Sequence, residues 1–311
     1  MGITIWVIIT LSFFLFRLVP GDPVSMMMTD DISVEAQQMI RAQWGLDKPL
    51  YEQYLLYMTN LLQGRLGISI FYKIPVWEVL MPKLINTLIL MGTSMLLAVL
   101  LGGLGGTYLA WRRGSGSEKG GVILILFMRS IPIFWLGILL LMVFTYWLRL
   151  FPGGGMHRTG FVSSSLFGNY LNWDFARHLT LPLLCSLLYN IGDPLMIMRS
   201  SMLEVKGEDF LTLLKAKGLS EFSVMRECAR NAMLPLVTYV GVLVGYAFSG
   251  QVLLETVFAW PGVGREIVWA VFKRDYAIVQ GSFVLMAFVV VMMNFLVDLS
   301  YGLLDPRIVY K

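Results

Sequence analysis

Apolar stretches long enough to cross a membrane recur along the chain, separated by polar segments. A helix needs about 20 residues to cross the hydrocarbon core of a bilayer. Six stretches come near that length or exceed it: residues 3–19, 84–111, 122–148, 179–202, 232–255 and 277–304. The pattern predicts an all-α integral membrane protein with one transmembrane domain over residues 1–311, an outer loop over 20–83 and an inner loop over 203–231.

The first stretch has a second interpretation, a secretory signal peptide that is removed after export. Signal peptides begin with basic residues and end at a small-residue cleavage site. Neither feature flanks residues 3–19. We therefore expect this stretch to stay in the protein as a membrane helix.

Composition agrees with the membrane class. Hydrophobic residues fill 57% of the 311 positions and charged residues only 14%, whereas charged residues make up about 25% of soluble domains. The net charge of +4 does not indicate a nucleic-acid partner. The basic residues of the inner segments lie beside the ends of apolar stretches, where membrane orientation explains them.

Orientation follows from the density of lysine and arginine. With the N-terminus inside, the inner segments 112–120, 199–231 and 305–311 hold eleven basic residues in about 50 positions. The outer segments also hold eleven, but spread over about 115 positions. Because short cytoplasmic loops carry the excess of Lys and Arg, both termini are expected in the cytoplasm.

Residues suited to catalysis or metal binding are sparse. His157 and His178 lack cysteine or carboxylate partners at ligand spacing, and structural roles are expected for both. The run 114–120 contains glycines and a lysine, but not the spacing of a phosphate-binding loop. Cys185 and Cys228 fall in the fourth stretch and the inner loop, so no disulfide is expected. The sequence predicts no enzyme, no bound cofactor and no metal.

The outer loop carries two short amphipathic patterns. The first runs from Val34 to Trp44, and the second follows Pro49, with Asp47 as its expected cap. Their apolar faces are expected to rest on the bilayer surface or on the transmembrane helices. A folded outer cap is favoured over a direct contact with a solute.

The inner loop is the most charged part of an otherwise apolar chain. Helical periodicity predicts one helix from Glu204 to Lys217, and Gly218 ends it, since glycine readily takes the left-handed conformation that closes helices. Ser220 is the expected cap of a second helix. Spacing of three and four residues places four side chains on one face: Phe210, Leu213, Leu214 and Lys217. Periodicity alone fits an ordinary membrane-surface hairpin equally well.

Asp193 is the strongest candidate for contact with a solute inside the membrane, because a charge in hydrocarbon normally faces a partner or water. It lies between Gly192 and Pro194, which loosen a helix. A carboxylate there is suited to a cationic amine. The alternative is an ion pair with Arg129 or Arg199.

Four glycines in the second stretch, Gly102, Gly103, Gly105 and Gly106, predict close helix packing.

Motifs along nearly the whole chain resemble the permeases of binding-protein-dependent ABC importers, in the dipeptide, oligopeptide and nickel branch. In the first third they are Pro20-Gly21-Asp22-Pro23, Gly45-Leu46-Asp47, Pro49-Leu50, Gln53-Tyr54 and Asn86-Thr87-Leu88. In the inner loop they are Arg199, Ser201 to Val205, Asp209 to Leu219, Arg230-Asn231 and Leu234-Pro235. Towards the C-terminus they are Gly250, Glu255, Val257-Phe258, Pro261-Gly262, Gly264, Arg274-Asp275-Tyr276, Val279-Gln280-Gly281, Asn294, Asp298, Tyr301 and Asp305-Pro306-Arg307.

The resemblance implies the fold of a type I ABC importer permease, with six transmembrane helices and a cytoplasmic coupling helix that fits a groove of an ATPase. The residues that the resemblance assigns to this coupling site are Glu204, Asp209, Phe210, Leu213, Leu214, Lys215, Ala216, Lys217, Gly218 and Leu219. The implied partners are a second related permease, two cytoplasmic ATPase subunits that bind ATP and Mg, and an extracytoplasmic solute-binding protein. The implied location is the cytoplasmic membrane of a bacterium or archaeon.

Peptides are the leading substrates on this resemblance, followed by nickel chelates and other small polar solutes. A secondary transporter or channel is the competing class, and it predicts activity from this chain alone. Two segments depart from the family pattern: Gly64-Arg65-Leu66-Gly67 and Leu213 to Gly218. The apolar Leu213 and Leu214 leave the register of the coupling helix open. Relatives also carry further residues before the first span, which leaves open whether Met1 is the true start.

Overall fold

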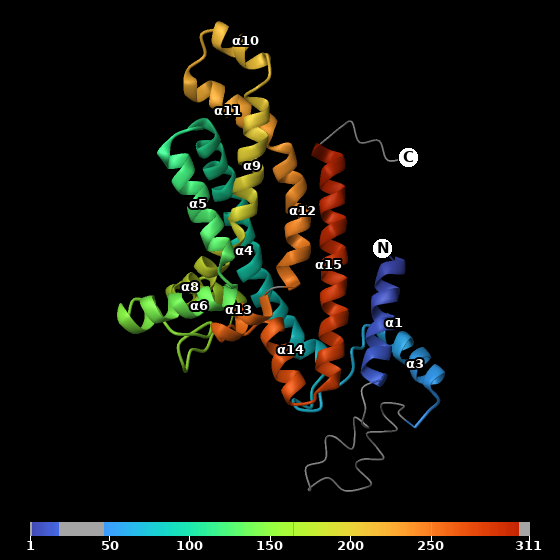
Figure 1. Ribbon diagram of the computed structural model, residues 1–311. Helices are drawn as coiled ribbons and strands as arrows, with labels where there is room; N and C mark the ends of the chain where they lie inside the picture. The colour runs from blue at the N-terminus through green and yellow to red at the C-terminus, as the bar shows by residue number, and fades with distance from the viewer. Residues whose placement is uncertain (1, 19–46, 164, 250, 305–311) are drawn as a thin grey trace. The chain divides into compact units, whose positions relative to one another are not determined.

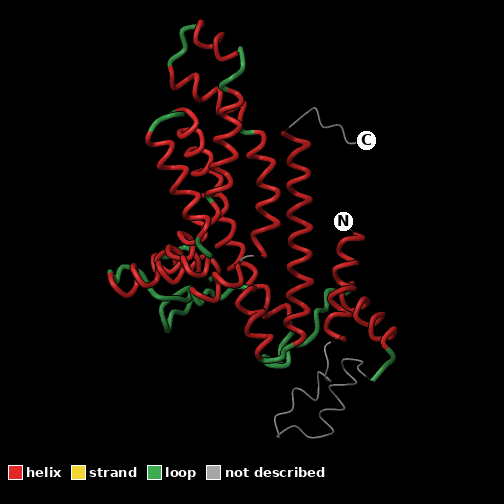
Figure 2. The backbone as a smooth tube through the Cα atoms, viewed as in Figure 1, coloured by secondary structure: helices red, strands yellow, loops and turns green. Residues whose placement is uncertain are grey.

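The computed structural model describes residues 2–18, 47–163, 165–249 and 251–304. Within these ranges the regular elements are helices joined by loops, with an isolated antiparallel bridge between Ile68 and Pro75 (Figures 1 and 2). The all-helical fold predicted from the apolar pattern is confirmed. The amphipathic pattern predicted at 34–44 and the motifs at 20–23, 250 and 305–307 lie outside the described residues.

The chain divides into two compact units. The first comprises Met1–Asn86 and Gly262–Met292. Its helices are α1 (Gly2–Leu18), α3 (Leu50–Leu62), the start of α4 (Val76–Trp111), α14 (Val263–Phe272) and most of α15 (Tyr276–Leu304). A buried apolar cluster that includes Leu80, Val263 and Ile278 joins α4, α14 and α15.

Helix α3 packs on α1 through aromatic side chains. The ring of Phe13, which is 1% exposed, lies 5.3 Å from that of Tyr54 and 5.4 Å from that of Tyr57. The hydroxyls of Tyr54 and Thr10 are 2.8 Å apart and hydrogen-bonded. Helix α3 begins at Leu50 after Pro49, close to the predicted start, but without a side-chain cap. The prediction of Asp47 as cap is wrong, because the fixed dihedral of Pro49 already sets the first turn.

The second unit comprises Thr87–Pro261 and Met293–Lys311. Besides the rest of α4 and α15, its elements are α5 (Gly116–Ser130), α6 (Ile133–Leu140), the π-helix η2 (Leu141–Trp147), α7 (Leu166–Tyr170), α8 (Trp173–Asn190), α9 (Gly192–Val205), α10 (Phe210–Ala216), α11 (Glu221–Ala232), α12 (Leu234–Ser249) and α13 (Gln251–Val257). Figure 1 shows α9 beside α5 and α12, with α10 and α11 beyond its end.

The predicted spans differ in the structure: some are single long helices, and one is a bent pair of helices. In the described ranges, three helices are long and apolar enough to cross a membrane: Val76–Trp111, Trp173–Val205 and Tyr276–Leu296. The predicted span 122–148 is instead a pair of helices, Gly116–Ser130 and Ile133–Trp147, bent by 101°, and counts as a fourth if taken as one broken span. Pro132 lies at the break and lacks the N–H that a continuous helix needs. The number of six spans stays a prediction.

Glycines bring α4 and α9 into close contact, as the glycine run predicts. A Cβ atom on Gly106 would lie 2.4 Å from the carbonyl oxygen of Leu195, and one on Gly102 would lie 2.8 Å from the Cβ of Pro194. Both distances are shorter than side chains tolerate. Only glycine therefore allows the two helices to approach this closely.

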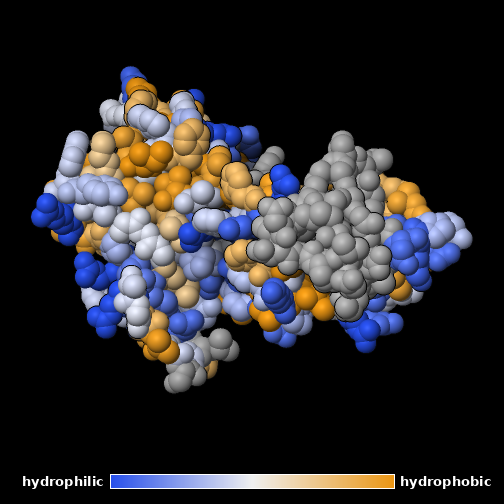
Figure 3. All heavy atoms as spheres, turned by 90° about the horizontal axis from the view of Figure 1, so that it is seen from below, coloured by the Kyte–Doolittle hydropathy of each residue, from blue (hydrophilic) through white to orange (hydrophobic). Residues whose placement is uncertain are grey.

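Many large apolar side chains remain exposed on the helices, among them Leu104, Phe127 and Phe288. Figure 3 shows hydrophobic side chains at the surface beside hydrophilic ones. Soluble monomers rarely expose apolar surface on this scale. Such a surface agrees with helices that face lipid or other membrane helices.

Candidate functional site

The inner loop folds as two short helices beyond the end of α9. Helix α9 ends at Val205, and α10 begins only at Phe210. The prediction of one continuous helix from Glu204 to Lys217 is therefore wrong. Between the two helices Gly207 donates its N–H to the carbonyl of Glu204 at 2.9 Å, which tightens the turn. Glycine is among the weakest helix formers, and its position explains the break.

The turn between α10 and α11 confirms two predictions made from local chemistry. Gly218 has a φ of +74°, the left-handed conformation expected after a helix. The hydroxyl of Ser220 accepts the N–H of Ser223 at 3.3 Å and caps α11. A side chain at position 218 would be strained whatever the space around it. The turn therefore fixes the orientation of α11 relative to α10.

The two faces of α10 have different surroundings. Phe210, Leu211 and Leu214 pack on a buried cluster formed by α9 and α11. Leu213 points away and is 56% exposed. The predicted shared face of Phe210, Leu213 and Leu214 is therefore divided. Phe210 and Leu214 pack inward together with Leu211, whereas Leu213 is exposed. Exposed neighbours extend the outer face: Lys215, Ala216, Lys217, Gly218, Leu219 and Phe222, with Glu204 and Asp209 exposed at the start of the loop.

Lys206 attaches this loop to the end of α4. Its Nζ donates to the carbonyls of Ala110 at 3.0 Å and Trp111 at 3.3 Å, and lies 4.9 Å from the centre of the Trp111 ring. A cation at the last carbonyls of a helix stabilises the helix end. Partial burial lowers the pKa of Lys206 below its ordinary value, and the nearby Arg113 and Lys215 act in the same direction.

Two further contacts connect the same region. The indole N–H of Trp111 donates to a carboxylate oxygen of Glu221 on α11 at 2.9 Å. Arg199 on α9 forms an ion pair with the buried Glu118 on α5, which also accepts the N–H of Gly114 at 2.6 Å. Sequence reasoning named Arg199, but it missed Trp111, Glu118 and Glu221. The local signals for them are a Trp at the end of an apolar stretch and an acidic residue at the start of the next.

Asp193 lies farther along α9, away from the inner loop. It forms an ion pair with Arg129 on α5, and it accepts the hydroxyl of Tyr239 on α12 at 2.7 Å. The alternative of a pair with Arg129 is confirmed, whereas Arg199 pairs elsewhere. The side chain of Arg129 is 57% exposed and that of Asp193 33%. The two charges therefore lie at a surface of the unit.

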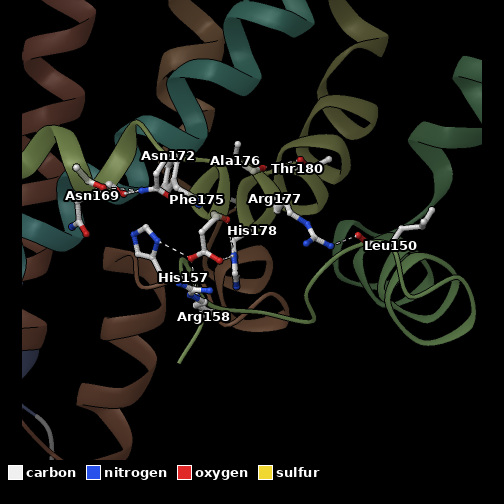
Figure 4. Close-up of polar contacts among 12 residues, drawn as sticks. Leu150, His157, Arg158, Asn169, Asn172, Phe175, Ala176, Arg177, His178 and Thr180 are labelled. Atoms are coloured by element: carbon white, nitrogen blue, oxygen red, sulfur yellow. Dashed lines mark hydrogen bonds and ion pairs between the residues drawn. The ribbon is translucent and has the colours of Figure 1, made fainter. Parts of the chain in front are cut away.

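The two histidines meet at one carboxylate (Figure 4). His157 Nδ1 lies 3.2 Å from Oδ2 of Asp174, and His178 Nδ1 lies 3.7 Å from Oδ1. The N–H of Arg158 donates to the same carboxylate at 3.0 Å, and the ring of His157 stacks on that of Phe161 at 4.1 Å. The sequence interpretation of both histidines as lacking a carboxylate partner is wrong, since the Asp174 carboxylate lies beside both rings. His178 Nδ1 is hydrogen-bonded to the backbone carbonyl of Asp174 at 2.8 Å. These contacts attach the loop that precedes α7 to helix α8.

A cavity of about 230 Å³ lies in the first unit, between the loop before α4 and α14. Its lining residues are Phe71, Tyr72, Glu266, Trp269, Ala270, Lys273 and Asp275. Lys83 pairs with Glu266 at 2.9 Å, and Asp275 accepts the N–H groups of Phe71 and Ile278. Burial and the carboxylate of Glu266 raise the pKa of Tyr72 to about 12. Glu266 therefore already has a cationic partner, and Asp275 already accepts hydrogen bonds from the protein.

Neither part of the molecule provides a metal centre in the ranges that the structure describes. No group of three or more His, Cys, Asp or Glu side chains there is arranged to hold a metal ion. The glycine-containing run 114–120 forms the turn before α5, where the Ser115 hydroxyl caps the helix by accepting the N–H of Glu118.

Comparisons with known proteins cover nearly the whole chain. Residues 98–310 match the family described as "Binding-protein-dependent transport system inner membrane component", and residues 1–91 match "Binding-prot-dependent transport system membrane comp, N-term". The dipeptide transport system permease protein DppB of Escherichia coli (strain K12) is 39% identical over 317 residues, which span 97% of this chain and 94% of the relative.

Two other relatives show a similar extent of likeness. The di/tripeptide transport system permease protein DppB of Pseudomonas aeruginosa (strain UCBPP-PA14) is 40% identical over 315 residues, 96% of this chain and 93% of the relative. The oligopeptide transport system permease protein AppB of Bacillus subtilis (strain 168) is 35% identical over 312 residues, 100% of this chain and 95% of the relative.

Proposed function

The chain belongs to the family of inner membrane components of binding-protein-dependent transport systems, and from this premise we propose that it is the permease subunit of an ATP-driven importer of di- or oligopeptides. It is a multi-pass protein of the inner membrane, and its role is non-enzymatic. The observation that carries the substrate class is full-length similarity at 35–40% identity to relatives named for peptide transport.

The proposed assembly pairs this chain with a second permease and encloses one pathway between them. Two cytoplasmic ATPase subunits bind ATP and Mg, and an extracytoplasmic binding protein delivers the peptide. Both termini of the chain lie in the cytoplasm, as the distribution of basic residues predicts. The inner loop then faces the ATPases.

The inner loop is the proposed contact with one ATPase subunit. The exposed face formed by α10, the following turn and the start of α11 supplies apolar contact through Leu213, Leu219 and Phe222. Lys215 and Lys217 supply charge at its edge. Phe210 and Leu214 support this face from behind. Because α10 and α11 pack on α9, a displacement of the loop moves α9 as a rigid body.

Uptake by the complete importer tests the proposal. The chain is purified with its partner permease and ATPases, reconstituted in proteoliposomes, and supplied with the binding protein and a radiolabelled dipeptide. We expect uptake that requires ATP and every component. Gradient-driven uptake by the chain alone would show a secondary transporter. Uptake of a nickel chelate or another polar solute, with none of any di- or oligopeptide, would contradict the substrate class.

Lys206 connects the proposed coupling loop to α4, and replacing it with methionine is expected to weaken coupling. The change keeps the apolar stem but removes the cation from the carbonyls of Ala110 and Trp111, a loss of about 1 kcal/mol for a partly exposed group. The expected result is about a threefold to tenfold fall in dipeptide imported per ATP hydrolysed, with the ATPases still co-purified. Lys119→Met, at an exposed lysine of α5, is the matched control. Equal coupling in both variants would contradict a role for Lys206.

A further inference from the structure

The ion pair between Arg129 and Asp193 is placed where a charge is costly. Both residues belong to predicted spans, 122–148 and 179–202. Asp193 is twelve residues before the end of α9 at Val205, a distance of about 18 Å along a helix that rises 1.5 Å per residue. The hydrocarbon core is about 30 Å thick. If the end of α9 marks the inner surface, the pair lies near the middle of the membrane.

Three helices hold the pair. Arg129 comes from the last turn of α5, Asp193 from the first turn of α9, and Tyr239 from α12. Gly192 lies against α5 at this point, since a Cβ atom there would lie 3.3 Å from a methyl of Ile125 and 3.9 Å from Cδ of Arg129. The arrangement is thus built by the packing of α5 on α9.

The pair is also open to its surroundings. More than half of the Arg129 side chain is exposed, and one third of that of Asp193. The structure gives Arg129 no second partner in the described ranges. A guanidinium exposed to lipid tails at this depth is strongly unfavourable, whereas one that faces an aqueous cavity or a binding partner is not. A water-filled path, or an interface that borders one, would avoid this cost.

We propose that the Arg129–Asp193 pair is a binding site in the translocation pathway. A zwitterionic peptide that reaches it separates the two side chains and forms an ion pair with each of them. The inference rests on the proposed function as a peptide importer. A peptide carries an ammonium group at one end and a carboxylate at the other. The ammonium pairs with Asp193 and the carboxylate with Arg129, so the peptide and the protein both keep their charges paired. Tyr239 positions the carboxylate of Asp193.

The first test asks whether Arg129 faces water. Cys185 and Cys228 are replaced by alanine in the complete importer, and R129C is treated with a cationic, membrane-impermeant methanethiosulfonate. The matched control is F127C, because Phe127 lies about 200° around the same helix and is 60% exposed. We expect R129C to react at least tenfold faster than F127C, because position 129 faces water and position 127 does not. Equal rates would overturn the inference.

The second test separates a pathway site from a structural ion pair. D193N and R129Q each leave one unpaired charge and are expected to lower dipeptide uptake at least tenfold, with the ATPases still co-purified. The double variant R129Q/D193N has no unpaired charge. A structural role predicts that it recovers uptake, and recovery would overturn the proposal. Uptake that stays at least tenfold low in the double variant supports the site.

Failure of the underlying function is distinguishable from failure of this inference. If the unaltered importer takes up no peptide, the proposed function itself is wrong. If the unaltered importer takes up dipeptide and the double variant does so equally well, only the site is wrong.

Discussion

Replacing Leu213 with aspartate is expected to abolish dipeptide import and to release the ATPase subunits from the purified complex. The side chain is 56% exposed and points away from the cluster that holds α10 to α9 and α11. The change therefore leaves the fold of the permease intact. A hot-spot residue at the centre of an interface contributes about 2 kcal/mol or more. We expect Leu213 to be such a residue, so that a charge there weakens binding about 30-fold or more. Co-purification of the ATPases with the permease measures the loss.

The matched control is the same change at Leu171, which is 77% exposed on the predicted outer side. Leu171→Asp is expected to leave ATPase binding unchanged. A second comparison uses Phe210→Ala, which removes support from the inner side of α10 and weakens binding by disturbing the fold of the loop. If Leu213→Asp retains both the ATPases and import, the outer face of α10 is not the coupling surface.

Replacing Gly106 with alanine is expected to be the most destabilising small change in the second unit. The new Cβ atom would lie 2.4 Å from the carbonyl oxygen of Leu195 and 2.8 Å from the Cβ of Met198. Backbone cannot give way as a flexible side chain does, so α4 and α9 must separate. Overpacking of this kind costs about 1–3 kcal/mol and occasionally more, and we expect the upper end. A fall in the thermal unfolding midpoint of the purified protein measures it.

Gly92→Ala provides the control on the same helix. Nothing lies within 4 Å of a Cβ atom at that position, and alanine is the better helix former by about 1 kcal/mol. The control is expected to leave the midpoint unchanged or to raise it. Equal destabilisation by both substitutions would show that the contact at Gly106 is not the cause. Because α9 leads to α10, separation of α4 and α9 is also expected to lower import.

Local chemistry predicted the features of the inner loop that depend on a few adjacent residues. The left-handed Gly218 and the cap at Ser220 follow from rules that act within one turn, and both are confirmed. The same kind of rule failed at Asp47, where Pro49 sets the helix start without a side-chain cap. Glycine at 207 also interrupts the predicted helix, although the apolar period continues past it.

The periodicity of apolar residues cannot predict contacts between segments that are far apart in the sequence. Helical spacing places Phe210, Leu213 and Leu214 on one side, but the helices packed on α10 determine which part of that side is buried. Glu118 and Arg199 are 81 residues apart in the chain, and no local pattern joins them. The meeting of both histidines at Asp174 has the same origin. Among these long-range contacts, only the ion pair between Asp193 and Arg129 was predicted as an alternative, because a charge inside a span requires a partner.

Photocrosslinking from position 213 tests the central claim most directly. A photoreactive phenylalanine analogue is placed at residue 213 of the complete importer and, as a control, at residue 171. We predict that light joins residue 213 to an ATPase subunit, that bound nucleotide changes the yield, and that residue 171 gives no such product. Crosslinks from residue 213 to lipid or to the binding protein alone would contradict the account.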